Sequence, residues 1–74
     1  MKLNKIVCRI LSEHVADFTK WVATNNEVRL TIPDTCTPTK LMIERALYDS
    51  DLIKFQAIYD LDEPNYITYK IRRA

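Results

Sequence analysis

The chain has 74 residues, of which 47% are hydrophobic and none is glycine, and its 11 Lys and Arg against 10 Asp and Glu give a net charge of +1. This length predicts a single domain spanning residues 1–74, with a small core. The near balance of charges excludes both a polybasic tail and an acidic mimic of nucleic acid. The absence of glycine excludes the glycine-rich loops that cradle phosphates in nucleotide-binding proteins.

The two cysteines, Cys8 and Cys36, are too few for a disulfide scaffold or for a structural zinc site. We expect both to be free thiols, as is typical of cytoplasmic proteins. Arg9 and Glu13 interrupt the apolar stretch that follows the first residues, so it does not resemble a signal peptide. No run approaches the roughly 18 apolar residues of a membrane span. The sequence therefore predicts a cytoplasmic protein with no membrane association, no metal and no cofactor.

The first 22 residues have the apolar spacing of an amphipathic helix. This spacing predicts one long helix that ends at Asn25 and Asn26. The positions that carry it are Leu3, Ile6, Val7, Ile10, Leu11, Val15, Phe18, Trp21 and Val22. A rival interpretation starts the helix at Ser12, a good N-cap residue, and makes residues 3–11 a strand. The long helix is favoured because Val7 and Leu11 break the alternation that a strand needs.

Residues 27–32 alternate strictly between polar and apolar side chains, which predicts a half-buried strand ended by Pro33. Thr37 and Pro38 have the pattern of a helix N-terminus, so a second helix is expected over residues 38–48. Its expected buried face consists of Met42, Ile43, Ala46 and Leu47.

Residues 52–60 and 66–72 each alternate, and the five residues between them predict a C-terminal β-hairpin. The first of these strands places Ile53, Phe55, Ala57 and Tyr59 on one face. The predicted order is α-β-α-β-β, an α+β fold with two helices packed on one face of a small three-stranded sheet. The absence of glycine favours an all-α alternative, but three segments with a period of two outweigh it.

Nothing in the sequence assembles a catalytic site, and we expect no enzymatic activity. His14 is the only histidine, and it lies on the apolar side of the predicted long helix. Cys8 is more than one turn away on that helix, so the two cannot form a Cys–His pair within it. The acidic residues at 49–51 and 60–63 fall at opposite ends of a predicted strand.

The outward side chains of the three predicted strands favour a polyanion as the partner. They bring together four cations, one tyrosine and several hydroxyl and amide groups, with no acid among them. Cations neutralise phosphates and an aromatic ring stacks on bases. We therefore expect a small accessory or regulatory protein that binds single-stranded nucleic acid with weak sequence specificity. The expected contacts are Arg29, Lys54, Lys70 and Arg72 to phosphates and Tyr66 to a base.

An alternative function is that of a protein-interaction module, an inhibitor or adaptor that binds no nucleic acid. Leu41 and Tyr48 are seven residues apart on the second predicted helix, opposite its expected buried face. An apolar pair in this position is typical of a contact surface. The partner would be another protein or a second copy of this chain.

Overall fold

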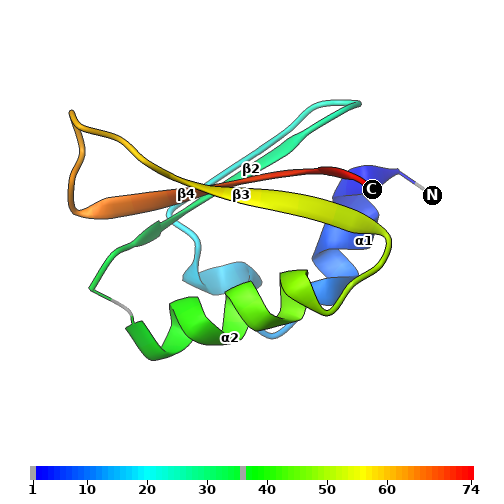
Figure 1. The fold of residues 1–74 in the computed structure, drawn as a ribbon, viewed down its shortest axis with the longest axis horizontal. Helices are drawn as coiled ribbons and strands as arrows, with labels where there is room; N and C mark the ends of the chain where they lie inside the picture. The colour runs from blue at the N-terminus through cyan, green and yellow to red at the C-terminus, as the bar shows by residue number, and fades with distance from the viewer. Residues whose placement is uncertain (1, 36) are drawn as a thin grey trace.

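The computed structural model describes residues 2–35 and 37–74 and confirms the α+β class. Two helices lie on one side of a four-stranded antiparallel sheet of order β1-β2-β4-β3 (Figure 1). In chain order the elements are α1 (Leu3–Ile10), the 3₁₀ helix η1 (Val15–Asp17), β1 (Lys20–Ala23), β2 (Val28–Pro33), α2 (Thr37–Tyr48), β3 (Ile53–Tyr59) and β4 (Tyr66–Arg73). The sheet has one strand more than the sequence predicts.

The second half of the chain folds as its periodicity predicts. The hairpin of β3 and β4 runs in continuous register from Ile53 opposite Arg73 to Tyr59 opposite Ile67. β4 also pairs with β2 and so occupies the middle of the sheet. The second helix begins one residue earlier than expected and ends at Tyr48.

The core lies between the sheet and the helices. Its buried side chains come from every second residue of β2 and β4, one face of α1 and two positions of α2. The fully buried members are Leu3, Val7, Leu11, Val28, Leu30, Ile32, Ile43, Leu47, Ile67, Tyr69 and Ile71. Burial of this apolar surface supplies most of the stability of so small a domain.

Tyr69 is the largest buried side chain and brings a hydroxyl into the core. The hydroxyl donates a hydrogen bond to Glu44 Oε2 on α2 at 3.1 Å, so its burial leaves no polar atom without a partner. The Tyr69 ring meets Phe55 edge to face, with 6.2 Å between ring centroids. Burial and the neighbouring Glu44 carboxylate raise the pKa of the Tyr69 phenol well above its usual value.

The prediction of one long helix over the first 22 residues is wrong, and so is the rival strand at residues 3–11. Residues 3–10 form α1, η1 follows, and residues 20–23 form β1. A continuous helix over these residues would leave residues 20–23 unable to pair with β2, and β2 would remain an edge strand. Because the chain turns back after η1, β2 gains a hydrogen-bonded partner on that side.

Two aromatic residues that fit the helical spacing, Phe18 and Trp21, reach the core without a helix. Trp21 faces the helices from β1, paired with Leu30 of β2. Its indole Nε1 donates a hydrogen bond to Asn4 Oδ1 of α1 at 2.7 Å. Phe18 packs edge to face on the Trp21 ring, with 5.5 Å between centroids. Both rings therefore reach the core from a strand and the turn before it, and Trp and Thr near position 20 favour that strand.

Asn25 and Asn26, the predicted end of the long helix, form the tip of the β1–β2 hairpin. The backbone N–H of Thr24 donates to the Glu27 carbonyl at 2.8 Å, and Thr24 Oγ1 accepts from the Glu27 N–H at 3.1 Å. None of the described non-glycine residues has a positive φ angle. The turns in the described chain thus use backbone conformations that do not require glycine, which removes the objection to a β-rich fold.

Met42 is the one error in the predicted face of α2. Its side chain is 55% exposed, whereas Ile43 and Leu47 are buried and Ala46 is partly buried. Met42 lies at the margin of the helix face, where the loop after α1 leaves a hollow. In the part of the chain that the structure describes, no helix is long and apolar enough to cross a membrane.

Candidate nucleic-acid interface

The face of the sheet opposite α1 and α2 carries the predicted site and is called the open face here. Its side chains are the residues of each strand that alternate with the core positions. Directly paired residues share a face, so the register assigns every strand's outward set. The open face comprises Lys20, Val22, Arg29, Thr31, Pro33, Lys54, Gln56, Ile58, Tyr66, Thr68, Lys70 and Arg72.

The register brings the four predicted cations into one area. Arg29 of β2 lies opposite Lys70 of β4, and Lys54 of β3 lies opposite Arg72 of β4. Adjacent strands are about 4.8 Å apart, so these side chains are near neighbours although up to 43 residues separate them in sequence. The prediction that these strands place their cations on one face is therefore correct in its geometry.

The expectation that no acid lies among these cations is wrong, because Glu27 binds three of them. Its Oε2 accepts a hydrogen bond from Arg29 Nε at 2.7 Å, and its Oε1 accepts from Arg72 Nη2 at 3.1 Å. Lys70 Nζ lies 3.4 Å from the same Oε1. The hydrogen bond from Arg29, followed by that from Arg72 and the charges of Arg29 and Lys70, lowers the pKa of Glu27 to about 2.

Sequence reasoning missed Glu27 because it counted the outward residues of this strand from Arg29 onward. Glu27 closes the β1–β2 hairpin, next to Val28, which pairs with Ile71. Continuing that register places Glu27 opposite Arg72. An acid two residues before Arg29 in a strand pattern was a usable signal, since residues i and i+2 share a face.

A fifth cation, Lys20, was also missed, because it falls within the predicted long helix. It lies on β1 opposite Thr31 and therefore on the open face. The face thus holds five cations and one carboxylate that already engages three of them. Its net charge stays strongly positive, although the whole chain is nearly neutral.

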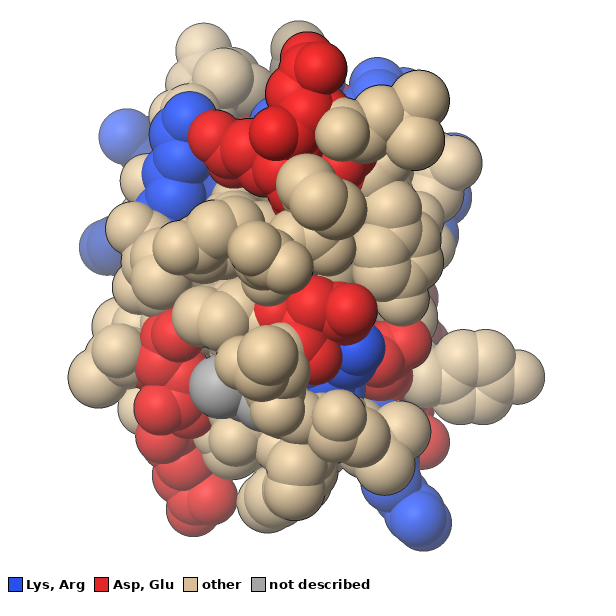
Figure 2. Space-filling view, turned by 90° about the vertical axis from the view of Figure 1, so that its left-hand side faces the viewer, with Lys and Arg blue, Asp and Glu red and all other residues tan. Residues whose placement is uncertain are grey.

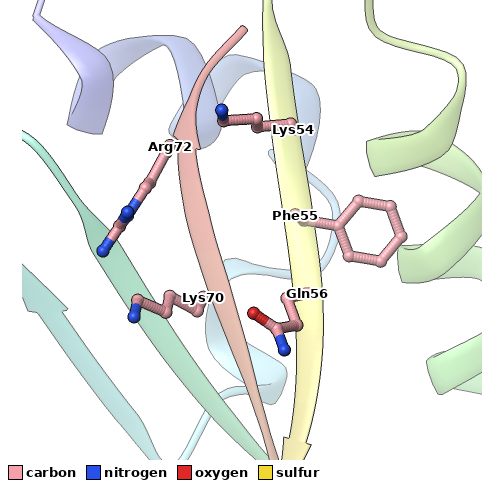
Figure 3. A pocket seen from close by; sticks show the side chains of 5 residues that line it. All are labelled: Lys54, Phe55, Gln56, Lys70 and Arg72. Carbon is pink, nitrogen blue, oxygen red and sulfur yellow. The ribbon is translucent and has the colours of Figure 1, made fainter.

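A hollow of about 210 Å³ opens on the β3–β4 side of this face. Figure 3 shows Lys54, Gln56, Lys70 and Arg72 around it, whereas the Phe55 ring points away toward the helices. The polar side chains around the hollow are therefore three cations and one amide, and two of these cations, Lys70 and Arg72, also bind Glu27. This set matches phosphate oxygens together with a neutral hydrogen-bonding group.

Tyr66 stands at the other end of β4, opposite Pro33 of β2, and is 37% exposed. Four residues of a strand span about 13 Å, so the ring lies about that far from Lys70 along β4. Thr31 and Thr68 lie between them, and their hydroxyl oxygens are 3.0 Å apart. The ring and the cations therefore occupy separate parts of one continuous face.

Acidic side chains are prominent at the end of the molecule where the β3–β4 loop lies. Figure 2 shows that end, with acidic groups in several places and most cations at the margins. The loop itself contains Asp60, Asp62 and Glu63. Among residues 2–35 and 37–74, no three His, Cys, Asp or Glu side chains are grouped as a metal site requires.

The other residues singled out in the sequence are away from the open face. Leu41 and Tyr48 lie on α2 and are 64% and 82% exposed. His14 lies in the turn after α1, where its Nδ1 is 3.1 Å from Asp17 Oδ2, and not on a helix as predicted. Cys8 is a free, partly buried thiol of α1, and Cys36 lies outside the described residues.

A comparison of the chain with protein-family models, with curated proteins and with solved structures finds no match.

Proposed function

We propose that this protein binds single-stranded nucleic acid through the open face, with weak sequence specificity and in an accessory or regulatory role. The observation that carries the proposal is the gathering of five cations from all four strands on one face, five against a single carboxylate. Phosphate contacts by Lys and Arg are independent of sequence.

The geometry supports phosphate contacts at one end of β4 and base stacking at the other. Lys54, Lys70 and Arg72 surround the hollow and hold phosphates, while Gln56 contributes hydrogen bonds. Tyr66 stacks on a base. The ring lies roughly 13–20 Å along β4 from Lys70 and Arg72, a distance that a few nucleotides cover. An open sheet with one exposed ring and flanking cations is a surface to which unpaired bases can lie flat.

The salt dependence of binding tests the proposal most directly. Three or four phosphate contacts predict a slope of about −2 to −3 for log K against log salt on a single strand. A Lys70→Ala/Arg72→Ala variant should lower the affinity and make the slope shallower by about 0.7 for each phosphate that is no longer neutralised. The matched control is Lys5→Ala/Arg9→Ala, which removes the same charge from exposed positions of α1. Equal binding by both double variants would contradict the proposal.

Tyr66 provides a second and independent test. Tyr66→Ala should cost about 1–3 kcal/mol of binding without changing the salt slope, because stacking releases no counterions. Tyr66→Phe retains the ring and should bind nearly as the parent does. A salt slope that changes with Tyr66→Ala would show that the ring orders the cations and does not stack.

The second candidate function is a protein-interaction module, and the exposure of Leu41 and Tyr48 favours it. Two large apolar side chains seven residues apart on a helix form a patch that water solvates poorly. Leu41→Ser/Tyr48→Ser should abolish a protein contact and leave nucleic-acid binding unchanged. An absence of nucleic-acid binding by the parent at low salt would favour this candidate over the first.

A further inference from the structure

The two edges of the sheet differ in how they are protected. β1 forms one edge with four residues, and β3 forms the other with seven. Proteins commonly protect an edge strand with proline, several charges or a bulge. β3 has no proline, one charge at Lys54, and an unbroken register with β4. In Figure 1 it runs along the near side of the sheet, with no described segment in front of it.

The hydrogen-bond pattern shows which backbone groups of β3 point outward. Ala74 N donates to the Leu52 carbonyl at 3.1 Å, which makes Leu52 and Ala74 a hydrogen-bonded pair in line with the register. Such pairs alternate in an antiparallel ladder. Lys54, Gln56 and Ile58 therefore bond to β4. The residues whose N–H and C=O groups face away from the sheet are Ile53, Phe55, Ala57 and Tyr59.

We propose that a second copy of this chain pairs with β3 through these outward groups. One antiparallel register uses all four of them: Ile53 opposite Tyr59 of the second copy, and Phe55 opposite its Ala57. The two-fold axis then passes through Gln56, perpendicular to the sheet. The pairing forms about eight backbone N–H···O bonds and joins the two sheets into one of eight strands.

The side chains match in this register. Lys54 lies opposite Ile58 of the second copy, so no two cations face each other along β3. Phe55, a large ring, lies opposite the small Ala57, and the two Gln56 amides meet at the axis and can bond to each other. The sequence of β3 is thus complementary to itself when reversed, which favours a second copy over an unrelated extended peptide.

The exposed pair on α2 lies beside the same edge. α1 packs beneath β2 and α2 beneath β3, so the flank of α2 away from α1 lies on the β3 side. Met42, Ala46 and Asp49 line the hollow toward α1. At 100° per residue, Leu41 and Tyr48 fall on the opposite flank. In the proposed dimer the two α2 helices lie under the joined strands, and these apolar side chains face the other copy.

This inference does not rest on nucleic-acid binding, and sedimentation equilibrium of the full chain tests it. We expect a monomer–dimer equilibrium with a dissociation constant in the micromolar range. A parent protein that stays monomeric up to about 1 mM would overturn the proposal. Ala57→Pro removes an outward N–H and leaves the bonds to β4 intact, so it should abolish the dimer while circular dichroism shows the parental fold. Dimerisation of a folded Ala57→Pro variant like that of the parent would also overturn it.

Gln56 tests the register itself without disturbing the core, because its side chain is exposed. Gln56→Lys and Gln56→Glu each place like charges against each other at the two-fold axis. Each variant alone should dimerise several-fold more weakly than the parent. An equimolar mixture of the two should recover association as a heterodimer. If both variants dimerise like the parent, or if mixing restores nothing, the proposed register is wrong.

Discussion

Replacement of Glu27 by Gln tests how the open face sets its own affinity. The Glu27 carboxylate binds Arg29, Lys70 and Arg72, which are three of the four cations expected to contact phosphates. A bound phosphate must therefore compete with an internal anion that is already in place. Glu27→Gln keeps the shape of the side chain but removes its charge and replaces one of its two acceptor oxygens by a donor, so the three cations become available to the ligand.

The size of the effect follows from counterion release. One negative charge fewer allows the face to neutralise up to one more phosphate, and each adds about −0.7 to the slope of log K against log salt on single strands. We take the two proteins to bind equally at about 1 M salt, where counterion release gives no advantage. Glu27→Gln then binds about fivefold more tightly at 0.1 M salt and about 25-fold more tightly at 0.01 M.

Fluorescence anisotropy of a labelled single strand, titrated at several salt concentrations, measures both slopes. Glu13→Gln is the matched control, because it changes the net charge equally at an exposed position beside the helices. Circular dichroism confirms that each variant is folded. The reasoning fails if Glu27→Gln keeps the parental slope, or if Glu13→Gln gains as much affinity.

Three further predictions concern stability. The folded-state pKa of Glu27, about 2, is below its usual 4.5, so its ion pairs stabilise the fold fully above pH 4.5 and progressively less as the pH falls toward 2. Urea unfolding across this range should show a loss of stability that Glu27→Gln lacks. The pKa of the Tyr69 phenol is raised above its usual 10.0 by burial and by Glu44, so the contribution of this group to stability should be constant below pH 10 and be lost above it. Lys40, whose pKa is raised by its hydrogen bond to Asp34, also loses its contribution in the alkaline range, so Tyr69→Phe should make the fall in alkaline unfolding curves smaller, and an unchanged fall would refute the assignment. Leu30→Ala in the core should lower the free energy of unfolding by about 2–5 kcal/mol, a large part of the roughly 4–11 kcal/mol expected for a chain of this length. Leu41→Ala at an exposed position should lower it by less than about 0.5 kcal/mol. Equal denaturation midpoints for the two variants would contradict the burial pattern.

The sequence by itself determined the elements in which local pattern and burial agree. β2 and β4 alternate because one face is buried and the other is open, and that period is visible without coordinates. The hairpin of β3 and β4 needed only two such runs and a short polar turn. The predicted outward residues followed directly from these strands, and they are Arg29, Lys54, Tyr66, Lys70 and Arg72.

The first 22 residues show why a period is not sufficient. Residues Val15, Phe18, Trp21 and Val22 continue a helical spacing, yet they lie in η1, the following turn and β1. Local spacing cannot tell that β2 gains a hydrogen-bonding partner if the chain turns back. The balance between these two outcomes depends on contacts far apart in sequence.

Only the tertiary structure decided the electrostatics of the open face. Glu27 is 45 residues from Arg72, and their contact exists because β2 and β4 pair in one particular register. Lys20 joined the same face only because β1 is a strand. Side-chain type and alternation are properties of the chain, whereas the partners of a charge depend on which strands lie side by side, and that is fixed by the cooperative packing of the whole core.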